Sequence, residues 1–101
     1  MASFLFTYRA PTQYAPGTPE AVAEWKAFFA AMGGHLVAMG EPVFTRETVG
    51  ATNDTVLGGY SLVDADDLDA ALAIAKDCPL VSRGGGVEVG ELTSVDEGVS
   101  A

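Results

Sequence analysis

The sequence predicts one α+β domain whose elements follow the order strand, helix, strand, strand, helix, strand. Two stretches, residues 19–32 and 66–77, carry apolar residues at helical spacing. Four shorter stretches rich in aromatic and β-branched residues surround them, and such residues favour strands. We therefore expect a four-stranded antiparallel sheet with two helices covering one face.

The first half of the chain is expected to form one strand, one long helix and a second strand. The aromatic run at residues 4–8 predicts the first strand. Thr18 and Pro19 are typical of a helix start, because a hydroxyl caps free N–H groups and proline fits the first helical position. A pair of glycines after Met32 ends this helix, and residues 35–39 predict the second strand.

The second half is expected to form a third strand, a second helix and a fourth strand. Residues 56–63 predict the third strand, in which two adjacent glycines indicate a bulge or the close approach of another backbone segment. The acidic start of residues 66–77 suits the positive end of a helix, and Pro79 stops that helix. Residues 87–90 predict the fourth strand.

One face of the second predicted helix is apolar. Its stripe follows helical spacing and consists of Leu68, Ala71, Leu72 and Ala75. We expect this stripe to pack in the core, so that truncation of Leu72 to alanine costs about 2–5 kcal/mol of unfolding free energy. Cys78 follows the helix, whose negative end raises a thiol pKa, and this position indicates a packed, inert thiol.

Composition and charge restrict the classes of function. The 101 residues fit one domain, expected to span residues 1–92, with 93–101 as a flexible tail. A net charge of −9 repels phosphate backbones and anionic membranes, so neither nucleic acid nor a membrane is an expected partner. One cysteine cannot supply a thiolate cluster, and we expect no metal and no cofactor. We recognise no export signal and no bilayer-spanning apolar run, and therefore expect a cytoplasmic location.

Apolar side chains lie on both faces of the predicted sheet. Alternation along the first strand places Phe4 and Phe6 on one face and Leu5 on the other. The third strand sets Leu62 against Val63 in the same way. Two helices cover only one face, and a large exposed apolar patch is unusual on a soluble monomer. We therefore expect a homodimer joined through the sheet face opposite the helices.

The second half of the chain also resembles a known family. The run GYSLVDADDLDAA at residues 59–71, followed by AKDCP at 75–79 and GGVEV at 85–89, is similar to the YCII-related (DGPF-type) family. The helix that contains Trp25, with the glycine and apolar strand after it, is similar to the first half of that family. The resemblance implies a ferredoxin-like βαββαβ unit that dimerises through its sheet as a dimeric α/β barrel. Such units have strand order 4-1-3-2 or a close variant.

The chain departs from the family pattern at residues that matter for chemistry. The Asp-Gly-Pro-Phe run that names one branch is absent, and the corresponding loop at residues 48–54 reads TVGATND. Another branch combines a histidine of the first helix with an Asp-Pro pair as an acid–base couple. Here the first helix has no histidine, and Cys78 and Pro79 stand where the Asp-Pro pair would be. That couple is therefore not carried over to this chain.

Five residues are candidates for a ligand-binding cleft. The single histidine, His35, could act as a general base because an imidazole titrates near pH 6.5, and a capping or surface role is the alternative. Arg9, at the end of the first strand, could hold a carboxylate. The full candidate set is Tyr8, Arg9, His35, Glu41 and Tyr60. By contrast, helical spacing indicates a core role for three aromatic residues, Trp25, Phe28 and Phe29.

Two classes of function fit these observations. One is a small dimeric binding module that accepts a small organic ligand in an apolar cleft between sheet and helices. The alternative is a cofactor-independent enzyme of the isomerase or lyase type, acting on a small oxygenated substrate, as in similar dimeric barrels. The enzyme requires a titratable group with a shifted pKa inside the cleft, and the five candidates are the groups that we nominate.

Overall fold

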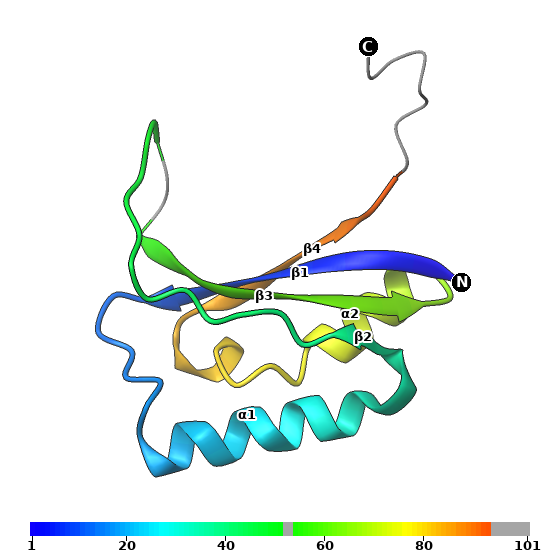
Figure 1. Cartoon of the computed structure of the whole chain (residues 1–101), viewed down its shortest axis with the longest axis horizontal. Coiled ribbons are helices and arrows are strands. Elements are labelled where there is room, and N and C mark those ends of the chain that lie inside the picture. The colour runs from blue at the N-terminus through cyan, green and yellow to red at the C-terminus, as the bar shows by residue number, and fades with distance from the viewer. Residues whose placement is uncertain (52–53, 94–101) are drawn as a thin grey trace.

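In the computed structural model (Figure 1), β1 (Ala2–Pro11) runs through the middle of a four-stranded sheet. It pairs with β3 (Thr55–Ala65) on one side and with β4 (Gly86–Glu91) on the other. β2 (Leu36–Ala38) lies beside β3, and all three pairs of neighbours are antiparallel. The order β2-β3-β1-β4 is the predicted 4-1-3-2 arrangement, so the predicted α+β, ferredoxin-like topology is confirmed.

The first helix, α1 (Pro19–Met32), has the bounds that the sequence predicts. Thr18 caps it, because its hydroxyl oxygen accepts the backbone N–H of Ala21 at 3.1 Å. A turn of 3₁₀ helix, Gly33–His35, then leads directly into β2, which is therefore shorter than predicted.

The second helix, α2 (Leu68–Ala75), covers the same face of the sheet as α1 (Figure 1). It starts later than predicted because Asp67 is its N-cap, with a carboxylate that accepts the backbone N–H of Ala70 at 2.8 Å. The chain continues through a second 3₁₀ turn, Val81–Arg83, before β4 begins.

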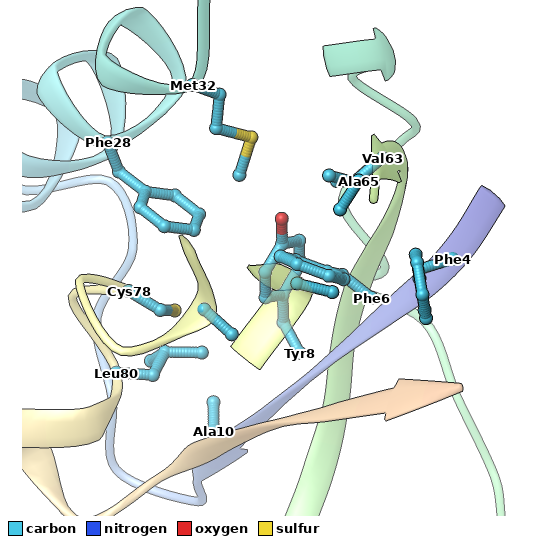
Figure 2. Close-up of a cluster of buried hydrophobic side chains, with 12 residues drawn as sticks. Phe4, Phe6, Tyr8, Ala10, Phe28, Met32, Val63, Ala65, Cys78 and Leu80 are labelled. Atoms are coloured by element: carbon cyan, nitrogen blue, oxygen red, sulfur yellow. The ribbon is translucent and has the colours of Figure 1, made fainter. Parts of the chain in front are cut away.

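The hydrophobic core fills the space between the two helices and the sheet face that they cover (Figure 2). β1 supplies alternate side chains to it, and Phe4 and Phe6 are fully buried. Phe28 and Met32 of α1 pack onto them from the helix layer. The remaining members of this buried cluster are Tyr8, Ala10, Val63, Ala65, Ala71, Ala75, Cys78 and Leu80.

The prediction that the apolar stripe of α2 packs in the core is wrong for its two leucines. Leu68 and Leu72 are 45% and 42% exposed, whereas Ala71 and Ala75 are buried and Ile74 packs against the core. The apolar stripe of a helix spans more than about 100° around the helix axis, so the spacing of its residues does not determine which edge of the stripe faces the core. The helix turns its alanine edge inward, and small side chains there let the backbone approach the sheet closely.

The sheet face opposite the helices has no element packed on it among residues 1–51 and 54–93, which the structure describes (Figure 1). Leu5 and Leu62 pair across the strands on this face and are half-buried, and Tyr60 is 40% exposed. Within the described part of the chain, no helix is long and apolar enough to cross a membrane. The predicted flexible tail at 93–101 lies, apart from its first residue, outside that part.

Candidate functional site

A cleft with a volume of about 370 Å³ opens on the helix side of the sheet, next to α1. We call it the α1 cleft. Residues of β1, of α1, of the segment that joins β2 to β3 and of the middle of β3 line it. Its lining residues are Tyr8, Ala10, Tyr14, Pro16, Val22, Trp25, Lys26, Phe29, residues 39–44, Arg46, residues 58–60 and Leu80.

Aromatic rings form one side of the α1 cleft. The Trp25 ring meets the Tyr8 ring edge to face with centroids 4.9 Å apart, and it lies 5.7 Å from the Phe29 ring. The indole Nε1–H of Trp25 donates to the hydroxyl oxygen of Tyr14 at 2.8 Å. Each ring is held by its neighbours, so this side of the cleft is ordered before any ligand arrives.

Residues 39–46 form the opposite wall, and two glycines allow them to lie close to β3. A side chain at Gly40 would collide with the backbone carbonyl of Tyr60, and one at Gly59 would lie 2.9 Å from the Glu41 carbonyl oxygen. Both glycines also have positive φ angles, 75° and 152°, which other residues rarely adopt. The close backbone approach predicted at the glycine pair of the third strand is therefore confirmed. The Val43 N–H donates to the Gly58 carbonyl at 3.1 Å and fixes the wall.

The Tyr8 hydroxyl is tied into a short chain of hydrogen bonds behind the cleft. It donates to the hydroxyl oxygen of Ser61 at 2.9 Å, and Ser61 donates to the Met39 carbonyl at 2.7 Å. Burial raises the pKa of Tyr8 to about 12, and the nearby Cys78 thiol adds to the rise while the Ser61 bond opposes it. Tyr8 is therefore a neutral phenol at physiological pH and is not available as a base.

The structure brings three of the five nominated residues to the cleft and leaves two outside it. Tyr8, Glu41 and Tyr60 line it. Tyr60 alternates with buried Ser61 along β3, and this alternation directs the Tyr60 side chain toward the other sheet face.

Arg9 and His35 lie elsewhere. The Arg9 guanidinium donates to Thr55, from Nε to the side-chain oxygen at 3.2 Å and from an Nη to the carbonyl at 3.0 Å. His35 is exposed at the end of its 3₁₀ turn, with Nδ1 2.9 Å from the Asp64 carbonyl oxygen. Its hydrogen bond joins the start of β2 to the end of β3, which is a structural role.

Several lining residues were not nominated from the sequence. Trp25 and Phe29 were expected in the core with Phe28, but only Phe28 is buried, and the other two are half-buried at the cleft. Lys26, Phe44 and Arg46 belong to no sequence motif, so nothing in the sequence singled them out. The one sequence signal that could have identified this surface is a helical face that holds more aromatic rings than a small core accommodates.

A second depression, about 520 Å³ in volume, lies between α1 and residues 76–82. It is lined by four residues of α1, two of them alanines, and by the segment that follows α2, including Cys78. Burial raises the pKa of the Cys78 thiol to about 11, so this group is protonated and unreactive at neutral pH. Among the described residues no group of three or more His, Cys, Asp and Glu side chains could hold a metal ion. The α1 cleft is thus the better candidate site.

These features define a class of protein: a ferredoxin-like α+β domain with an apolar cleft between its first helix and its sheet. Comparison with protein-family models identifies the YCII-related domain over residues 4–95. The chain belongs to the YCII-related family. Comparison with curated proteins finds no match.

Proposed function

We propose that this protein is a small-molecule binding module and that its ligand occupies the α1 cleft. The observation that carries the proposal is apolar surface left exposed around a concave site. Val22, Met39 and Phe44 line the cleft and are 41%, 57% and 69% exposed. Pockets for small organic molecules have this form, since they are mostly apolar with a few polar groups and have volumes of roughly 300–1,000 Å³.

The chemistry of the lining residues favours binding over acid–base catalysis. Tyr8 is held neutral by its raised pKa, and His35 lies outside the cleft. Glu41 is the one carboxylate among the lining residues. The alternative, a cofactor-independent isomerase or lyase, would therefore use Glu41 as its base. Replacement of Glu41 by glutamine should not weaken ligand binding in a binding module, whereas it should abolish turnover in an enzyme.

The cleft contains its own reporter of occupancy, because Trp25 is the only tryptophan of the chain. We expect a neutral apolar probe such as N-phenyl-1-naphthylamine to quench or shift Trp25 fluorescence in a saturable manner. Phe44→Ala should weaken this binding about tenfold, since loss of part of an aromatic contact costs about 1.4 kcal/mol. Val37→Ala is the matched control, because Val37 is 57% exposed and lies outside the cleft lining. Equal affinities in the two variants would contradict the assignment of the site.

We also propose that the protein is a homodimer joined through the sheet face opposite the helices. The apolar pair of Leu5 and Leu62, with Tyr60 beside it, supports this proposal. The α1 cleft opens on the helix side, so a dimer of this kind leaves it accessible.

A further inference from the structure

The charges that line the α1 cleft differ in sign from the charge of the whole protein. The chain carries 14 acidic residues against 5 Lys and Arg, a net charge of −9. Two of those five cationic residues, Lys26 and Arg46, line the cleft, and Glu41 is the single acid there. The cleft thus has one positive charge in excess on a strongly negative molecule.

Two other cationic residues are already engaged by the protein itself. Arg83 forms an ion pair with Glu24 at 2.7 Å, and Arg9 donates to Thr55 on β3. Arg46 has more of its donors left over, because its bond within the protein runs from one Nη to the nearby Val43 carbonyl at 2.8 Å. This bond holds the guanidinium at the cleft wall while using one of its five N–H donors.

Tyr14 adds a neutral donor to the same site. Its hydroxyl oxygen accepts the indole N–H of Trp25, so the phenol proton is left to point toward another acceptor. The cleft therefore combines an aromatic side with three groups that donate hydrogen bonds: Tyr14, Lys26 and Arg46.

We infer that the ligand of the α1 cleft is an aromatic monocarboxylate, a mono- or bicyclic ring system with one negative charge. This inference rests on the proposed function of the cleft and names its ligand class. The ring packs on Trp25 and Phe29, and the carboxylate accepts from Lys26, Arg46 and Tyr14, since charge-assisted hydrogen bonds are the stronger ones. A single excess positive charge matches a monoanion better than a phosphate ester, which carries close to two charges at neutral pH.

Calorimetric titrations of the full chain with three probes test the inference: 2-naphthoate, 2-naphthalenemethanol and 2-naphthyl phosphate. These probes share a ring system and differ in charge. We expect 2-naphthoate to bind at least tenfold more tightly than the alcohol and more tightly than the phosphate. We also expect 0.5 M salt to weaken the binding of 2-naphthoate and to leave the affinity for the alcohol unchanged, because salt screens only the interaction with the charged group.

Variants of the two cationic residues assign the effect to the cleft. Lys26→Gln and Arg46→Gln should each reduce 2-naphthoate affinity severalfold, and the double variant should bring it to that of the alcohol. Lys76→Gln is the matched control, because Lys76 is exposed and lines the other depression. All three positions are exposed, so the thermal midpoints should stay close to that of the unsubstituted protein.

The other outcomes separate the inference from the proposed function. Equal binding of alcohol and carboxylate would overturn the inference and leave the binding module standing. Tighter binding of the phosphate would overturn the monoanion assignment. Failure of all three probes to bind at millimolar concentration would count against both. A change in oligomeric state in Phe44→Ala would show that a second copy of the chain, rather than a small ligand, covers the cleft.

Discussion

At the scale of single residues, Tyr8 links the core, the cleft and the pH dependence of folding. Its pKa rises from 10.0 to about 12 on burial, and that of Cys78 rises from 9.0 to about 11. Both groups are neutral when protonated, so the folded state holds their protons more tightly than the unfolded state does. The stability that depends on these protons is complete below pH 9 and is lost as pH rises from about 9 to about 12.

Urea unfolding between pH 7 and pH 11 tests this linkage. We expect the unfolding free energy to be level up to about pH 9 and then to fall. Tyr8→Phe should be less stable by about 0.5–1.5 kcal/mol at pH 7, because the Ser61 hydroxyl loses its donor. The same variant should show a shallower decline above pH 10, since one of the two titrating groups is gone. An unchanged slope would mean that Tyr8 does not titrate with unfolding.

At the scale of elements, the orientation of α2 decides how its residues respond to substitution. Leu72 is 42% exposed, so Leu72→Ala should cost less than about 1 kcal/mol rather than the 2–5 kcal/mol expected of a core leucine. Ala71 is fully buried, so Ala71→Leu should cost about 1–3 kcal/mol through overpacking against β3 and β4. Denaturant melts of the two variants compare them directly. The reverse ranking would place the leucine edge of α2 inward.

The elements were predictable from the sequence, whereas the rotation of α2 and the composition of the cleft were not. Helical spacing, the Thr18 cap and the glycine stops identified α1 to the residue, because these signals are local. The inward edge of α2 depends on tertiary contacts, since the helix packs Ala71 and Ala75 against β3 and β4. The cleft brings α1 together with residues 39–46 and the middle of β3, and only tertiary contacts place them side by side.

At the scale of the whole molecule, the two faces of the sheet differ in what they present. One face carries the helices, the core and the α1 cleft, and the other presents paired apolar residues. The proposed ligand site and the proposed dimer interface therefore lie on different surfaces. A variant that disrupts the dimer should keep its affinity for cleft ligands within about twofold, provided that it remains folded.

Light scattering coupled to size exclusion tests the dimer. A monomer has a mass of 10.4 kDa, and we expect about twice that value at micromolar concentration. Leu62→Glu should dissociate the dimer, because it places a charge beside Leu5 at the centre of the proposed interface and adds to the repulsion between chains of net charge −9. Leu72→Glu makes the same exchange on the helix side and should leave the dimer intact.

Salt provides an independent check on the same interface. Repulsion between two chains of net charge −9 opposes association, whereas burial of apolar area drives it at about 25 cal/mol per Å². Raising the salt concentration from 50 mM to 500 mM screens the repulsion and should tighten the dimer. A dimer that weakens with salt would instead depend on ion pairs, and one that survives Leu62→Glu but not Leu72→Glu would join through the helix side. Either result would place the interface away from the apolar pair of Leu5 and Leu62.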